Sequence, residues 1–266
     1  MASRPPKSAG ASLAQGDCRL PTIARRVRSA TMTVEVLKPI RKRSAEAQAS
    51  DALRAHILGG GARPGSRLTE IGLSQQLRLS RSTIRTALHQ LANEGLVVQV
   101  PYTDWQVASL SGADAWELYT LRASLEALGT RLAVGALTQE GEQMIVAAQD
   151  ALVQACHTGD RVAIADQDLG LHSTIVELSG HRRLREHYRL VRQQIRLYIA
   201  WSDALMQDVD AIIETHRWLV DAMLQRDADR AASLAHDHCE SAGRTLAEFL
   251  GKRVETGGES ILLKSK

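Results

Sequence analysis

Two groups of side chains in this sequence have the types and spacing that could do chemistry. Asp168 and His172 stand four residues apart, so on a helix both would project from one face. A carboxylate and an imidazole placed together suit zinc, and also nickel, manganese or iron. The alternative is structural, because a buried histidine most often only forms a hydrogen bond inside the core.

The second group is short, polar and basic, and it opens a predicted helix from Arg81 to Glu94. A helix that enters the major groove of DNA needs such side chains in its first turn, where base edges and phosphates are closest. The positive end of the helix dipole also faces phosphate there. The candidate DNA contacts are Ser80, Arg81, Ser82, Thr83 and Arg85.

Within this group, Arg81 and Arg85 share one helix face. We expect one of them to read a guanine and the other to bind guanine or the backbone, while Ser82 and Thr83 bind phosphate. The alternative is a solvated basic face with no ligand.

The elements around this basic helix form a recognisable pattern. Apolar spacing predicts a helix from Ala45 to Leu58 that three glycines stop, and Thr69 can cap a short helix over 70–77. Ser80 can cap the basic helix, whose Ile84, Leu88 and Leu91 form one buried stripe. A strand over 96–100, a turn and a return at 105–107 follow. This order of three helices followed by a β-hairpin predicts a winged helix-turn-helix over 44–110.

The following residues show no strand pattern. Breaks at glycine, serine and aspartate predict a second, all-helical bundle domain over 114–250. The fold class is therefore mostly α, and the polar residues 251–266 are expected to be a flexible tail. The six expected helices are 114–134, 138–158, 160–179, 181–202, 208–225 and 227–250.

Composition limits the class of protein. Of 266 residues, 44% are hydrophobic and only 3% aromatic, so the cores must rest on aliphatic side chains, which favours helices. The absence of an apolar run of 18 residues excludes a membrane helix. Three cysteines far apart, without a CxxC pair, argue against a disulfide framework or a thiolate zinc site. A cytoplasmic location is the default expectation.

Charge is distributed unevenly. Residues 1–43 carry ten basic and two acidic side chains, a net +8, so the rest of the chain holds −5 of the total +3. A basic arm, mostly disordered by composition, suggests contact with a polyanion. The alternative is a solvated leader with no function.

The order of several short motifs gives a family resemblance. Residues 45–110 resemble the DNA-binding domain of the GntR family of bacterial transcription regulators. The motifs are Leu53-Arg54-x-x-Ile57-Leu58, Pro64-Gly65-x-x-Leu68, Leu77-x-Leu79-Ser80-Arg81-x-x-Ile84-Arg85-x-Ala87-Leu88 and Leu91-x-x-Glu94-Gly95-Leu96-Val97. Residues 115–250 resemble the FCD-type ligand-binding domain of the FadR subfamily, through Leu121-Arg122-x-x-Leu125-Glu126, Asp168-x-x-x-His172, Ser179-Gly180, Glu214-x-His216 and His238.

The resemblance implies a site and a function. It implies that Asp168, His172, His216 and His238 hold a divalent metal, with His238 preferred to His236 because it follows His216 by the family's spacing. It also implies a homodimeric regulator, most often a repressor, on a palindromic double-stranded operator. A small organic acid would be the effector, bound at the metal and by Arg122; the alternative for Arg122 is an ion pair with a neighbouring glutamate. The basic side of the predicted helix 181–202 adds Arg189 or Arg192 as further candidates, and the alternative there is a surface stripe paired with acidic neighbours.

Two departures from the family pattern bear on DNA affinity. Ile71 stands where the family usually has an arginine, and the wing carries Asp104 where a basic residue is usual. An acidic wing tip would repel phosphate. Either the basic arm compensates or the operator is bound weakly.

Two other functions compete with a ligand-responsive regulator. The first is a hydrolytic enzyme, in which a histidine–carboxylate metal site activates water. No motif places a separate general base, and a winged helix attached to an enzyme is unusual. We therefore expect that the protein is not an enzyme. The other is a paralogue that binds DNA weakly and has no effector, which Ile71 and Asp104 favour.

Overall fold

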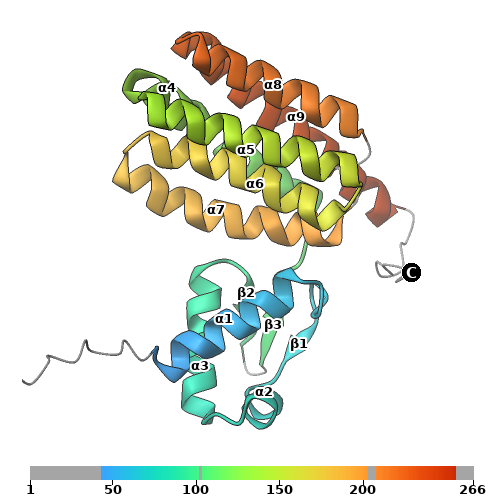
Figure 1. The fold of residues 1–266 in the computed structure, drawn as a ribbon. Helices are drawn as coiled ribbons and strands as arrows, with labels where there is room; N and C mark the ends of the chain where they lie inside the picture. The colour runs from blue at the N-terminus through green and yellow to red at the C-terminus, as the bar shows by residue number, and fades with distance from the viewer. Residues whose placement is uncertain (1–42, 102–103, 203–207, 256–266) are drawn as a thin grey trace, which may run out of the picture. The chain divides into compact units, whose positions relative to one another are not determined.

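The computed structural model describes residues 43–101, 104–202 and 208–255. The expected basic arm therefore lies outside the described residues except for Arg43, as do Tyr102 and Thr103 of the wing and the tail from residue 256. The described chain is mostly helical, with a winged helix-turn-helix followed by a helical bundle, which confirms the predicted fold class (Figure 1).

The winged helix-turn-helix contains three helices and a small antiparallel sheet. Strand order is β1-β3-β2, with Leu68 opposite Trp105 and Val97 opposite Val107. The two-residue strand β1 was not predicted, because so short a segment shows no alternation of apolar and polar residues. The elements are α1 (Ala45–Leu58), β1 (Arg67–Leu68), α2 (Glu70–Leu77), α3 (Arg81–Asn93), β2 (Val97–Gln99) and β3 (Trp105–Val107).

Side-chain caps set the starts of the two helices that form the helix-turn-helix. The hydroxyl of Thr69 accepts the N–H of Gly72 at 3.1 Å, and that of Ser80 accepts the N–H of Thr83 at 3.1 Å. Both caps were predicted and are confirmed. The predicted stripe of α3 is confirmed as well, since Ile84, Leu88 and Leu91 are fully buried.

A buried ion pair joins α1 to the end of α3. The guanidinium of Arg54 donates two hydrogen bonds of 2.8 Å to the carboxylate of Glu94. Gly95 follows with a φ of +74°, a left-handed conformation that glycine adopts without strain. Helix α3 is thus held at both ends, by its cap and by this pair.

Six helices build the bundle, and their number confirms the prediction. Each starts within two residues of the expected position. The last helix runs to Glu255, five residues past the expected end, into the segment that was predicted to be tail. The helices are α4 (Gly112–Ala136), α5 (Gln139–Thr158), α6 (Arg161–Leu178), α7 (Arg182–Trp201), α8 (Val209–Leu224) and α9 (Ala228–Glu255).

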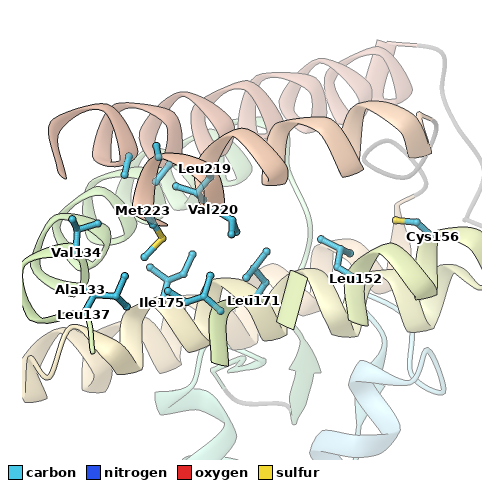
Figure 2. Packing of buried hydrophobic residues seen from close by; sticks show 14 of the residues in the cluster. Ala133, Val134, Leu137, Leu152, Cys156, Leu171, Ile175, Leu219, Val220 and Met223 are labelled. Carbon is cyan, nitrogen blue, oxygen red and sulfur yellow. The ribbon is translucent and has the colours of Figure 1, made fainter. Parts of the chain in front are cut away.

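The largest core cluster of the bundle is aliphatic, as the low aromatic content predicted, while Tyr119, Tyr188 and Tyr198 are buried in the smaller clusters. Helix α4 packs against α6, α7, α8 and α9, and α5 packs against α6 and α8. Figure 2 shows Leu219, Val220 and Met223 of α8 facing Leu171 and Ile175 of α6 across this core. Among the described helices, none is both long and apolar enough to cross a membrane.

Candidate metal centre and nucleic-acid interface

Three helices bring four metal-ligating side chains together inside the bundle. Asp168 and His172 come from α6, His216 from α8 and His238 from α9, and one ligand atom of each lies within 4.8 Å of the others. Asp168, His172 and His216 are buried and His238 is half-buried. The helical spacing of Asp168 and His172 does place both on one face, as predicted.

The hydrogen bonds of the imidazole rings turn two of their Nε2 atoms toward the centre of this cluster. Nδ1 of His216 donates to the carbonyl oxygen of Ile212 at 2.7 Å, because a carbonyl can only accept. Nδ1 of His172 lies 2.5 Å from Oε2 of Glu126, a close contact without hydrogen-bond geometry; because a lone pair on Nδ1 would repel the carboxylate at this distance, the proton belongs on that nitrogen too. The Nε2 lone pairs then face each other, 3.1 Å apart.

These acceptors require a positive charge among them. Oδ1 of Asp168 lies 3.0 Å from Nε2 of His216 and 4.0 Å from Nε2 of His172. Adjacent ligands of a zinc ion with bonds of roughly 2.0–2.1 Å are about 2.9–3.4 Å apart, so the spacings of 3.0 and 3.1 Å fit a metal, whereas the longer spacings of up to 4.8 Å would have to shorten on binding.

The electrostatics of the cluster favour an ionised Asp168 and a neutral His238. Burial raises the pKa of Asp168, but contacts with His216 and His172 outweigh it and bring that pKa well below its usual value. Burial and the neighbouring His216 and His172 hold the pKa of His238 well below its usual value. An ionised carboxylate beside a neutral imidazole is the protonation state in which a metal ion binds.

Arg122 places a second positive charge beside the cluster. Its Nε donates to Oε1 of Glu126 at 2.6 Å, and its NH2 nitrogen has no hydrogen-bond partner, 3.9 Å from Oδ2 of Asp168. The residue is 2% exposed. Although burial alone would lower it, the pKa of Arg122 is raised well above its usual value, mainly by Glu126.

A cavity of about 380 Å³ opens onto the metal ligands and Arg122. The hydroxyl of Tyr119, buried and without a hydrogen-bond partner, also lines it. The wall therefore combines Arg122 and hydroxyl groups with aliphatic ones and with the carboxylates of Asp168 and Asp208, so an organic anion would need the positive charge of Arg122 and of a metal ion to bind there. The rest of the lining includes Ile199, Ile212, Ala242, Thr215, Ser241 and Thr245.

The other two predicted effector contacts lie elsewhere. Arg189 and Arg192 of α7 line a different groove, against α6, which they share with Glu177 and Glu186. Of the three arginines predicted to bind the effector, Arg122 is thus the one that the described structure places at the metal ligands.

The five predicted DNA contacts gather at the start of α3. Ser80, Arg81, Ser82 and Arg85 are exposed and Thr83 is half-buried. The hydroxyl of Ser80 lies 2.8 Å from that of Ser82 and 2.9 Å from that of Thr83, so the three form one small hydroxyl cluster. The surface thus offers hydroxyls and guanidinium groups together.

Glu70 of α2 holds one of the two arginines, a role that the sequence analysis missed. Its carboxylate accepts hydrogen bonds from Nε and NH2 of Arg85 at 2.8 and 2.7 Å, whereas NH2 of Arg81 is 3.9 Å away. Arg85 is thereby fixed in direction, while Arg81 is freer to reach a base. Since Glu70 and Arg85 are 15 residues apart, no local spacing rule could have found the pair.

The acidic wing residue is already paired. Arg67 of β1 donates to Oδ2 of Asp104 from Nε and NH2, at 2.9 and 2.5 Å. Because the charge of Asp104 is compensated within the sheet, its expected repulsion of phosphate is reduced. Ile71, the other departure, is 55% exposed on α2 and so offers an apolar surface where the family pattern has a cation.

Comparison with known proteins identifies both halves of the chain. Residues 45–103 match the family described as bacterial regulatory proteins, gntR family, and residues 117–241 match the FCD domain. The Nta operon transcriptional regulator of Aminobacter aminovorans is 28% identical over 192 residues, 71% of this chain and 88% of that protein.

A second relative is an uncharacterised HTH-type transcriptional regulator in the TAR-I ttuE-ttuC' intergenic region of Agrobacterium vitis. It is 32% identical over 116 residues, which cover 42% of this chain and 68% of the relative. A GntR regulator from Rhodococcus sp. RHA1 shares the fold, with a TM-score of 0.66 and 23% identity over 77% of this chain and 99% of that one. The relatives are transcriptional regulators and not enzymes. The chain therefore belongs to the gntR family of bacterial regulatory proteins, and it is a DNA-binding transcriptional regulator with a C-terminal FCD domain.

Proposed function

We propose that this regulator binds a palindromic operator as a homodimer and acts as a repressor whose DNA affinity is set by a small carboxylate effector. The effector would bind at a divalent metal ion, zinc first among the candidates, held by Asp168, His172, His216 and His238. The observation that carries this proposal is that Asp168, His216 and His238 line a cavity that Arg122 also lines, and that the NH2 of Arg122 has no hydrogen-bond partner.

The bound ion would supply positive charge and open coordination positions for a carboxylate. Arg122 would take a second oxygen of the same anion, because its Nε is occupied by Glu126 and its NH2 is free. The hydroxyl of Tyr119 would donate a further hydrogen bond. The aliphatic part of the wall would pack against the carbon skeleton of the acid.

On the DNA side, a homodimer would present two copies of α3 to successive major grooves of a palindrome. Arg81 and Arg85 would read bases, with Ser80, Ser82 and Thr83 on phosphate. The exposure of these side chains and the positive end of α3 support this assignment.

A thermal-shift screen of small mono- and dicarboxylic acids on the zinc-loaded protein tests the effector site. Acids that bind should raise the melting temperature of wild type. In Arg122→Lys the shift should fall by more than half, because lysine keeps the charge but loses the fork of two N–H groups. The variant's metal content should be unchanged.

Arg189→Lys is the matched control, since Arg189 lines the other groove, and it should keep the full shift. A full shift in Arg122→Lys with a lost shift in Arg189→Lys would move the effector to that groove. No shift with any acid, together with no bound metal, would favour the paralogue without an effector.

Deleting residues 1–40 should weaken operator binding and reduce its salt dependence. Each phosphate contact that is lost lowers the slope of log K against log salt by about 0.9. The measurement is a binding titration at several salt concentrations. A deletion variant with unchanged affinity and slope would show that the arm does not compensate for the missing arginine at position 71.

A further inference from the structure

One buried carboxylate connects the metal ligands to the anion-binding arginine. Oε1 of Glu126 accepts hydrogen bonds from Nε of Arg122 at 2.6 Å and from the hydroxyl of Tyr188 at 2.9 Å. Oε2 lies 2.5 Å from Nδ1 of His172. The residue is 2% exposed, and its partners come from three helices, α4, α6 and α7.

The carboxylate of Glu126 determines on which atoms its neighbouring side chains carry their protons. The guanidinium of Arg122, which donates to Oε1 of Glu126 at 2.6 Å, pairs with this carboxylate in its ionised form. An ionised carboxylate only accepts hydrogen bonds, so every group facing it must present a proton. For His172 this puts the proton on Nδ1 and leaves the Nε2 lone pair directed at Asp168 and His216.

The other oxygen of Glu126 has the same effect on Arg122. It holds the guanidinium through Nε, so the NH2 end of this cavity-lining residue has no hydrogen-bond partner and lies 3.9 Å from Oδ2 of Asp168. One side chain thus prepares a ligand for the metal on one side and a donor for an organic anion on the other.

We propose that Glu126 is a positioning residue of the effector site, which fixes the tautomer of His172 for metal binding and the direction of Arg122 for the effector, so that its loss weakens both together. This inference rests on the proposed function. The simpler possibility is that Glu126 and Arg122 form only a structural ion pair, and the experiment is chosen to separate the two.

Glu126→Gln tests the proposal because it keeps the shape and removes the charge. With Arg122 and Tyr188 both donating, the amide oxygen should turn toward them and the NH2 group toward His172. Nδ1 of His172 must then accept, which moves its proton to Nε2 and blocks the metal-facing lone pair. Zinc affinity, measured by competition with a chromogenic chelator on folded protein, should fall 10–100-fold.

A second measurement reads the tautomer directly, by nitrogen-15 NMR of the imidazoles in metal-free protein. Wild-type His172 should be protonated on Nδ1 and the variant on Nε2. Glu94→Gln is the matched control, because Glu94 is an equally buried partner of an arginine far from these ligands. It should lower stability and leave zinc affinity within twofold of wild type.

The outcomes are distinct. Zinc affinity within twofold of wild type and an unchanged tautomer in Glu126→Gln would overturn the proposal. If that variant does not fold, wild type still decides, since His172 protonated on Nε2 in the metal-free protein would overturn it as well. Wild type that binds no metal but carries the Nδ1 proton would refute the proposed metal site and leave the positioning of His172 intact.

Discussion

Arg81→Ala should abolish sequence-specific DNA binding while both domains stay folded. The side chain of Arg81 is 59% exposed at the first turn of α3 and is not clamped by Glu70 as Arg85 is. A good guanidinium–guanine contact contributes roughly 1–3 kcal/mol, and a dimer loses it twice, so affinity should fall about 30-fold or more. A gel-shift titration against the native operator measures this.

The control for that titration is Arg230→Ala, which removes an exposed arginine from the bundle and should bind the operator like wild type. Non-specific DNA should be bound by Arg81→Ala nearly as well as by wild type, because one phosphate contact at most is lost. Operator affinity within twofold of wild type would show that Arg81 does not read a base.

His216→Ala should empty the metal site and lower the melting temperature of the bundle. A ligand present at 100 times its Kd stabilises the folded state by about 2.7 kcal/mol, which for a domain of this size corresponds to roughly 5–10 °C. Chelator should lower the midpoint of wild type by that amount and hardly move the variant. Metal content by mass spectrometry should fall in parallel.

His236→Ala is the matched control for this variant. It removes an imidazole two residues from His238 whose side chain is 43% exposed and faces Asp237 and Glu240, so it should keep the metal and the response to chelator. Wild type that holds no metal and responds neither to chelator nor to added zinc would leave the four residues as polar groups of the core.

The local part of the fold was predictable because its signals are local. The hydroxyls of Thr69 and Ser80 mark helix starts wherever they accept an N–H three residues on, and the breaks between the bundle helices fall at turn-forming residues. Strand β1 escaped prediction because two residues carry no periodicity.

The candidate site was predictable only in part. Spacing alone puts Asp168 and His172 on one helix face. Whether His216 and His238 meet them depends on how three helices pack, and only the family resemblance predicted that meeting. Glu126 was overlooked because a glutamate four residues after an arginine looks like an ordinary helical ion pair. Arg189 and Arg192 lie away from Arg122 because of the side of α7 that faces the cavity. The run of arginines along this helix does not indicate which side that is.

The pair between Glu70 and Arg85 has a consequence for how the regulator would search a genome. Loose binding to arbitrary DNA is driven by the counterions that unpaired cations displace from phosphates. Arg85 is already neutralised in the free protein, so it contributes little to that attraction. If Arg85 contacts DNA as proposed, it would become available only where a correctly placed base or phosphate replaces Glu70. The carboxylate would thereby reduce the time lost on random sequence and increase the contrast between operator and background.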